Sequence, residues 1–399
     1  MKLNALLKYF FLKVLIMAHK IPVRYLFWGG KRNNSVLIVK IDAIGDSIVW
    51  LDTAKEYRNL YPDKTLVLLY NTDWEEIALS LPYFDKFIPF SAKKFWKKIS
   101  YRFKMLAELN KNIFEVLVNP TYSRSFFYQD WVIHNINAIE KIGSTGDYNN
   151  TNNTIAKLTR DFSVINPKLK RIGDSWYTKL VRADEKPKME LIRNAEFLRT
   201  AYGINFKAQL PIFPFKIPAY KDLEDKLYCV IFMGAATERR IWNIEKYATI
   251  INSIPAEYEI VLCGGKKETY LYDLLMELKT VNKPIISLFG KTSLLELISV
   301  IKNATFIITN ETSASHITVA SRTRSICILG GGHYGRFQPY EVEEIADEDR
   351  IYLPQTVSLN MECFNCGWIC KYNLINGRWK CIADISTESV SQKLAQLLN

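Results

Sequence analysis

Short apolar runs rich in β-branched residues alternate with amphipathic stretches from residue 35 onward, and they do so in two separate series. This alternation is typical of βα units around a parallel sheet. The first series predicts strands at 36–39, 65–70, 86–90 and 114–118. The second series predicts strands at 229–233, 259–263, 285–288, 305–309 and 325–329. The predicted fold class is therefore α/β, with two Rossmann-like, doubly wound domains facing a central cleft, where ligands bind in such sheets.

The length of 399 residues agrees with two domains, because one hydrophobic core rarely grows so large. Pro211, Pro214 and Pro218 mark the linker between them, and the polar, turn-rich stretch 145–154 is expected to be a flexible excursion. The expected parts are a basic amphipathic arm over 1–32, an N-terminal domain over 33–205, a C-terminal domain over 219–360, and a cysteine-rich segment with a C-terminal helix over 361–399.

The arm over residues 1–32 holds seven cations and no acid, out of a formal net charge of +12. A helical repeat places its apolar residues mostly on one side; they are Leu6, Leu7, Phe10, Phe11, Val14, Leu15 and Met17. We expect this helix to lie on an anionic membrane surface, which predicts a cytoplasmic protein at the inner face of the membrane. Lys8 and Lys13 interrupt the run too early for a spanning helix or a signal peptide. An ordinary helix packed on its own domain is the alternative.

A second basic stretch, residues 93–104, interleaves six cations with aromatic residues. Aromatic residues among cations are also found in nucleic-acid-binding proteins. A basic amphipathic helix that faces a phosphorylated glycan or a lipid surface explains the same residues without nucleic acid. Lys97 and Lys98 are therefore candidates for binding an acceptor, and a merely solvated helix is the alternative.

The turn after the first strand carries Lys40, Asp42, Gly45 and Asp46. Gly45 allows a tight turn, and Asp46 falls at the start of a helix. An Asp at this place is either a helix cap or a group that acts at the carboxyl edge of the sheet. Both Asp42 and Asp46 lie where ligands bind in open α/β sheets.

The segment VLIVKIDAIGDSIVW resembles the N-terminal signature of glycosyltransferase family 9, the heptosyltransferases. The similarity continues through TKLVRADEKPKMELIRNAEFLRTAYGI and strengthens in MGAATERRIW, EIVLCGG, FGKTSLLELISVIKNATFIITNETSASHITVA and ILGGGHYGRFQPY. The resemblance implies a GT-B-type, inverting transferase that moves a sugar, usually heptose from ADP-heptose, onto a lipopolysaccharide core or another bacterial surface glycan. Asp46 would be the general base, with Asp42 as the reserve, and Lys40 and Asp42 would lie with Lys97 and Lys98 on the acceptor side.

The donor site that the resemblance implies lies in the C-terminal half. Glu296 would bind the ribose diol, Arg240 would bind the diphosphate, and a helix beginning at the sequence TNETSASH would offer an anion site. The donor-binding residues are thus Arg240, Glu296, Glu311, Thr312, Ser313 and His316. No Asp-x-Asp motif stands at a strand end of this half, so transfer is expected to need no metal cofactor, with His316 helping Arg240 to neutralise the leaving group.

Two loops depart from the family pattern. Glu311, Thr312 and Ser313 stand where relatives have Asp-Ser-Gly or Asp-Thr-Gly, and GGGHYGRF stands in place of Gly-Pro-Thr-Asp. His333 and Arg336 would then read a different phosphate or sugar, or cap the following segment. A different nucleotide sugar and a non-catalytic, membrane-associated relative are therefore alternatives. A nicotinamide-linked enzyme ranks far behind, because no Gly-x-Gly-x-x-Gly follows the first strand.

The cysteines near the C-terminus form the pattern CFNCGWIC, and ten residues separate it from a fourth cysteine. Four thiolates so spaced suit a tetrahedral Zn or Fe site, and oxidised pairs are the alternative. We expect a structural metal at Cys363, Cys366, Cys370 and Cys381. Cys229, Cys263 and Cys327 lie in apolar strand-like runs and are expected in the core.

Overall fold

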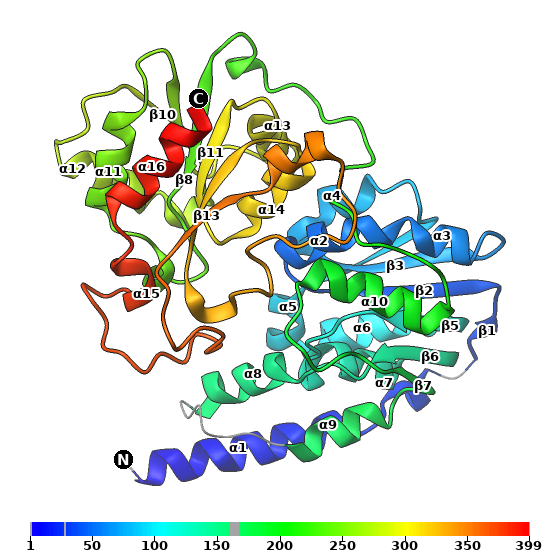
Figure 1. The fold of residues 1–399 in the computed structure, drawn as a ribbon. Coiled ribbons are helices and arrows are strands. Elements are labelled where there is room, and N and C mark those ends of the chain that lie inside the picture. The colour runs from blue at the N-terminus through cyan, green and yellow to red at the C-terminus, as the bar shows by residue number, and fades with distance from the viewer. Residues whose placement is uncertain (1, 28, 160–166, 399) are drawn as a thin grey trace. The chain divides into compact units, whose positions relative to one another are not determined.

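The computed structural model describes residues 2–27, 29–159 and 167–398, and the chain forms two compact units (Figure 1). The N-terminal unit comprises Met1–Ala43, Thr53–Lys186 and Arg193–Phe206. The C-terminal unit comprises Ile44–Asp52, Pro187–Ile192 and Lys207–Asn399. The turn that carries Asp46 thus belongs to the C-terminal unit, although its sequence lies near the N-terminus.

The N-terminal unit is built on a parallel sheet in the order β4-β3-β2-β5-β6-β7, with the short β1 paired to β5. Its strands are β1 (Lys31–Arg32), β2 (Ser35–Lys40), β3 (Thr65–Asn71), β4 (Lys86–Phe90), β5 (Asn112–Asn119), β6 (Ala138–Ser144) and β7 (Lys179–Val181). Its helices include α1 (Lys2–Lys20), α3 (Glu56–Leu60), α4 (Glu75–Leu79), α5 (Ala92–Lys97), α6 (Ile99–Leu109), α7 (Trp131–Asn135), α8 (Asn149–Thr159), α9 (Pro167–Asp174) and α10 (Glu190–Tyr202).

The C-terminal unit is built on a second parallel sheet in the order β10-β9-β8-β11-β12-β13. Its strands are β8 (Tyr228–Phe232), β9 (Glu259–Leu262), β10 (Ile285–Ser287), β11 (Phe306–Asn310), β12 (Ser325–Leu329) and β13 (Gln355–Ser358). Its helices include α2 (Ile44–Ala54), α11 (Ile244–Ser253), α12 (Tyr270–Glu277), α13 (Leu294–Lys302), α14 (Ser313–Ala320), α15 (Lys380–Ala383) and α16 (Thr387–Leu398).

Both sheets have the same strand order. If β2 is counted as the first strand of the N-terminal sheet and β8 as the first strand of the C-terminal sheet, each sheet has the order 3-2-1-4-5-6. This is the order of dinucleotide-binding doubly wound folds. Strands β2, β8, β11 and β12 are buried along their whole length, as expected where helices cover both faces of a sheet, and this burial explains their continuous apolar sequences. The predicted α/β class with two Rossmann-like domains is confirmed.

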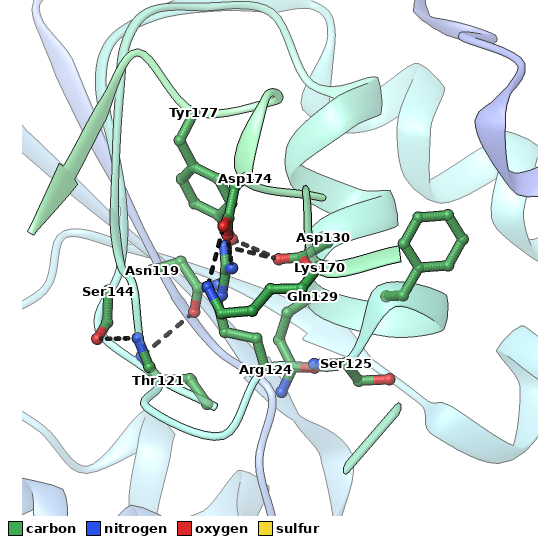
Figure 2. A network of polar contacts seen from close by, with 12 residues as sticks. Asn119, Thr121, Arg124, Ser125, Gln129, Asp130, Ser144, Lys170, Asp174 and Tyr177 are labelled. Atoms are coloured by element: carbon green, nitrogen blue, oxygen red, sulfur yellow. Dashed lines mark hydrogen bonds and ion pairs between the residues drawn. The ribbon is translucent and has the colours of Figure 1, made fainter. Parts of the chain in front are cut away.

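A buried polar network holds the N-terminal unit together behind β5. Arg124 is fully buried, contacts Asp174 at the end of α9, and has its Nη1 3.5 Å from a carboxylate oxygen of the buried Asp130. Tyr177 donates a hydrogen bond of 2.7 Å to Asp130, and Tyr148 donates another. Figure 2 shows Arg124, Asp130, Asp174 and Tyr177 pointing toward one another. A buried charge needs such partners, because its desolvation is costly.

Helix α1 is apolar on two opposite sides. On its inner side Leu12 and Ile16 are buried in a cluster with Phe126, Phe127 and Ile155. On its outer side a stripe at helical spacing is exposed; its members are Leu7, Phe10, Val14 and Met17. The side chains of Lys2 and Leu6 lie outside the described residues. No helix among residues 2–27, 29–159 and 167–398 is both long and apolar enough to cross a bilayer.

The prediction of a flexible excursion at residues 145–154 is wrong in its second half. Helix α8 begins at Asn149, and Thr151 is buried, where its hydroxyl accepts a hydrogen bond of 2.8 Å from the backbone N–H of Phe126. This tertiary contact compensates for a sequence of poor helix formers.

Candidate active site

The C-terminal unit has its topological switch point between β8 and β11, the place where such sheets bind ligands. Asn310, the last residue of β11, ties the two strand ends together, since its amide donates to the backbone oxygens of Met233 (2.7 Å) and Gly234 (3.1 Å). The segments that follow these two strands carry Arg240 and Glu311. The fold alone therefore directs attention to these residues.

Arg240 and Glu311 form an ion pair at this strand edge. Nη2 of Arg240 donates to the backbone oxygen of Glu311 at 2.9 Å and to its carboxylate at 3.3 Å. Burial raises the pKa of Glu311 to about 7, and Arg240 opposes that shift. Burial thus favours the neutral carboxyl group, which would compete less strongly than a carboxylate with an anionic ligand for the guanidinium.

The start of α14 offers backbone N–H groups beside this pair. Thr312 caps the helix, with its hydroxyl accepting from the N–H of Ala314 at 3.3 Å, and Ser313 is the first helical residue. Such a helix beginning attracts anions through its free N–H groups and its dipole.

His316 lies in the first turns of α14 and is buried. Its Nδ1 is 2.9 Å from the hydroxyl of Tyr340, and burial lowers its pKa to about 4. The imidazole is therefore neutral at pH 7. The expectation that His316 helps to neutralise a leaving group by its charge is not supported, although a neutral ring can still form hydrogen bonds.

Helix α2 begins next to α14. A Cβ built on Gly45 would lie 3.1 Å from Cδ2 of His316 and 3.7 Å from Cα of Ser313, so the two helix starts approach closely at this glycine. Asp46 follows directly, in the first turn of α2 and partly exposed. The beginnings of two helices, one with a carboxylate and one with an anion-binding turn, thus pack against each other.

Lys40 and Asp42 form a buried ion pair in the N-terminal unit, with 2.8 Å between Nζ and the carboxylate. Thr121 and Gln129 also donate to the carboxylate of Asp42, at 2.9 Å and 2.8 Å. The pair links the ends of β2 and β5, so these contacts favour a supporting role for both residues over direct acceptor binding.

The remaining predicted contacts lie on the surface. Glu296 is exposed and forms a capping box at the start of α13, where its carboxylate accepts from the N–H of Ser293 at 2.7 Å. Lys97 and Lys98 are exposed at the junction of α5 and α6. The aromatic neighbour Phe95 is buried in the core, so this residue stabilises the fold.

The four C-terminal cysteines line one pocket, together with Gly331, Trp368 and Trp379. All four are free thiols, and burial raises the pKa of Cys366 and of Cys381. No group of three or more His, Cys, Asp or Glu side chains in the described part of the chain is arranged as a metal site.

The glycine loop after β12 meets the cysteine-rich segment. His333 accepts a hydrogen bond of 3.3 Å from the indole of Trp368, and Arg336 pairs with Glu190 at 3.2 Å. Both side chains therefore already have protein partners within the C-terminal unit.

The strand edge that carries these residues lies within a region that matches a known family. Residues 174–358 match the family model described as glycosyltransferase family 9 (heptosyltransferase). The resemblance to glycosyltransferase family 9 is confirmed. The chain thus contains a heptosyltransferase-like glycosyltransferase region over residues 174–358, and this region includes Arg240, Glu296, Glu311 and the start of α14. No curated protein matches its sequence.

Solved structures of family 9 share the fold of this glycosyltransferase. A family 9 glycosyltransferase from Veillonella parvula is 16% identical with a TM-score of 0.68, covering 92% of this chain and 97% of its own. E. coli ADP-heptose lipopolysaccharide heptosyltransferase II is 14% identical with a TM-score of 0.61, covering 91% and 98%. The dodecameric, iron-containing heptosyltransferase TibC in complex with ADP-D-β-D-heptose is 11% identical with a TM-score of 0.52, covering 93% and 77%.

The structure brings together part of the predicted site of this glycosyltransferase. Arg240, Glu311, Thr312, Ser313 and His316 gather at one strand edge. Sequence reasoning missed Trp368, whose ring lies over the guanidinium of Arg240. Two sequence features could have indicated this residue. Trp368 lies between two closely spaced cysteines, and the three successive glycines at 330–332 leave room for an aromatic ring.

Proposed function

We propose that this glycosyltransferase is an inverting enzyme that transfers heptose from ADP-heptose to a lipopolysaccharide core or another bacterial surface glycan. The observation that carries the proposal is the packing of the α2 start against the α14 start at Gly45 and His316. Asp46 directly follows Gly45, which packs against the start of α14, a turn suited to bind a diphosphate. A base beside a phosphate site is what displacement at an anomeric carbon requires.

In the proposed reaction the acceptor hydroxyl oxygen attacks the anomeric carbon, and the bond from that carbon to the phosphate oxygen breaks. Asp46 takes the hydroxyl proton, and ADP leaves. Arg240 and the N–H groups at Thr312 and Ser313 meet the growing charge on the diphosphate. Glu296 is exposed, and one of its carboxylate oxygens accepts from the backbone of Ser293. The other oxygen would accept a hydrogen bond from a ribose hydroxyl.

The acceptor would be bound by the N-terminal unit. Lys97 and Lys98 are exposed cations suited to a phosphorylated glycan, while the buried pair of Lys40 and Asp42 would hold the strand ends beneath it. Two of the similar structures, an ADP-heptose heptosyltransferase and a heptosyltransferase in complex with ADP-D-β-D-heptose, support the choice of donor.

A thermal-shift screen against ADP-, GDP- and UDP-sugars tests the donor assignment. A ligand that binds only the folded protein stabilises it, by about 2.7 kcal/mol at a hundredfold excess over its Kd. ADP-heptose and ADP should raise the melting temperature, and the GDP and UDP compounds should not. Stabilisation by a UDP- or GDP-sugar alone would change the donor, and no response to any nucleotide would refute the assignment.

We also propose that the outer stripe of α1 lies on a membrane surface. Phe10 is 66% exposed and Met17 is 60% exposed, while Lys8, Lys13 and Lys20 supply charge that attracts anionic lipid. The inner side of the helix packs on its own unit. Packing on the domain and binding to a membrane surface are therefore compatible, because they use opposite sides of the helix.

Replacing Phe10, Val14 and Met17 together with Ser should weaken binding to vesicles that contain phosphatidylglycerol by at least about tenfold, because each buried apolar side chain contributes about 1.5–3 kcal/mol. Co-sedimentation measures the change. Ile139→Ser, at a residue of β6 that is also half exposed, is the matched control and should bind normally. Equal binding of the triple variant and wild type would exclude this surface.

We further propose that Cys363, Cys366, Cys370 and Cys381 hold a structural Zn or Fe ion, with the side chains closing on the ion when it binds. The donor set fits such an ion, since four thiols line one pocket and a cation would favour their thiolate forms. TibC is described as iron-containing. Elemental analysis should find about one Zn or Fe per chain, lost in a Cys366→Ser, Cys370→Ser variant; metal-free protein purified without chelator would contradict the proposal.

A further inference from the structure

The cysteine-rich segment from Met361 to Cys381 lies along the glycine loop of the C-terminal unit. The backbone N–H groups of Asn365 and Gly367 donate to the backbone oxygens of Gly331 (2.7 Å) and Gly332 (2.9 Å). These two bonds fix the position of the segment relative to the strand edge where Arg240 lies.

Three glycines are needed for this contact. A Cβ added at Gly330 or Gly332 would overlap the ring of Trp368, and one added at Gly331 would overlap Phe364. This loop differs from the family's Gly-Pro-Thr-Asp, and the difference has a physical reason. Residues with side chains at these positions would clash with the rings of Trp368 and Phe364, which pack directly on the glycine backbone.

Trp368 is held in one orientation. Its φ is +65°, a left-handed conformation that is uncommon for a bulky residue and that persists only where surrounding contacts fix it. Its indole N–H donates to Nδ1 of His333 at 3.3 Å. Three features therefore fix the ring of Trp368: its backbone conformation, its packing on the glycines and its hydrogen bond to His333.

Two tryptophans of this segment stack against two arginines that are neighbours in the sequence. The guanidinium of Arg240 lies 4.3 Å from the ring centre of Trp368, and that of Arg239 lies 5.0 Å from the ring centre of Trp379. Arg240 is thus fixed in plane by an aromatic face and along one edge by Glu311. Stacking of this kind orients the remaining N–H groups of a guanidinium before any ligand arrives.

We propose that Trp368 is a positioning residue of the donor site, which sets the plane of Arg240 for the donor diphosphate. The inference rests on the proposed function of Arg240. It makes the cysteine-rich segment a part of the donor site. Trp379 provides an internal control, since it lines the same pocket of cysteines but stacks on Arg239.

Calorimetric ADP affinity of the full chain tests the proposal. Trp368→Leu should weaken ADP binding by about tenfold, in the range of a partly desolvated cation–π contact, and Trp368→Phe should retain affinity within about threefold. Trp379→Leu should change the affinity by less than about twofold. Melting temperatures of all variants show whether each one is folded, and Trp368→Phe keeps the test open if Trp368→Leu is not.

A double substitution separates positioning from direct contact. In an Arg240→Met background, Trp368→Leu should cause no further loss of ADP affinity, because its effect acts through the guanidinium. A full additional loss would mean that Trp368 touches the nucleotide itself and would overturn the positioning role. Wild-type affinity of Trp368→Leu, with weakened Arg240→Met, would refute the inference alone. Wild-type affinity of Arg240→Met would refute the proposed role of Arg240.

Discussion

Asp46→Asn should lower kcat for sugar transfer by about 10²–10⁴-fold and leave ADP affinity within about twofold. The amide keeps the size and shape of the side chain and one acceptor oxygen, but it cannot take a proton from the acceptor hydroxyl. The loss should therefore appear in the chemical step. Rates measured with saturating ADP-heptose and acceptor, together with calorimetric ADP affinity, check this result.

Asp42→Asn is the matched control, since it changes the second carboxylate of the same turn. Its carboxylate is already occupied by Lys40, Thr121 and Gln129. We expect a lower melting temperature, because Lys40 is left buried without its counter-charge, and nearly normal kcat in the folded protein. Unchanged kcat in Asp46→Asn would end the general-base assignment, and a large loss confined to Asp42→Asn would transfer the role to Asp42.

Arg124→Met should destabilise the N-terminal unit by about 3–5 kcal/mol, because it leaves Asp130 and Asp174 without the guanidinium between them. Burial raises the pKa of Asp130, and Arg124 opposes this shift, so the buried carboxyl group loses the charge that favours its ionised form. Denaturant unfolding, followed through a transition assigned to this unit, measures the loss.

Lys170→Met is the control for this prediction, because Lys170 pairs with the same Asp174 at 2.9 Å but is one-third exposed. An exposed pair of this kind contributes about 1 kcal/mol or less. Equal losses in the two variants would show that burial of the network does not determine its contribution.

The strands that sequence patterns predicted are those with continuous apolar runs, such as β2, β8 and β12. Four of the described strands escaped prediction, among them β1, which has only the residues Lys31–Arg32. β6 (Ala138–Ser144) carries Glu140 and Lys141 within it, β7 has only the residues Lys179–Val181, and β13 (Gln355–Ser358) has one buried residue. Their pairing depends on neighbours already in the sheet, which a local pattern does not contain.

The candidate site was predictable where it follows strand ends and family motifs, as for Arg240 and Thr312. It was not predictable where side chains choose between partners. The sequence places Asp42 and Asp46 in one turn, and only the fold shows that Asp42 is tied to Lys40 and Thr121. Likewise, nothing local to Trp368 indicates that it covers glycines about 36 residues earlier in the chain.

Helix α1 could not act as a removable anchor. Leu12, Ile16 and His19 cover aromatic residues of the N-terminal unit, among them Phe127 and Trp131. Proteolytic cleavage at Lys20 would therefore expose this apolar cluster to water and destabilise the N-terminal unit. Polar substitutions on the buried side of this helix should therefore destabilise the N-terminal unit, and the proposed membrane contact would add a constraint on its exposed side.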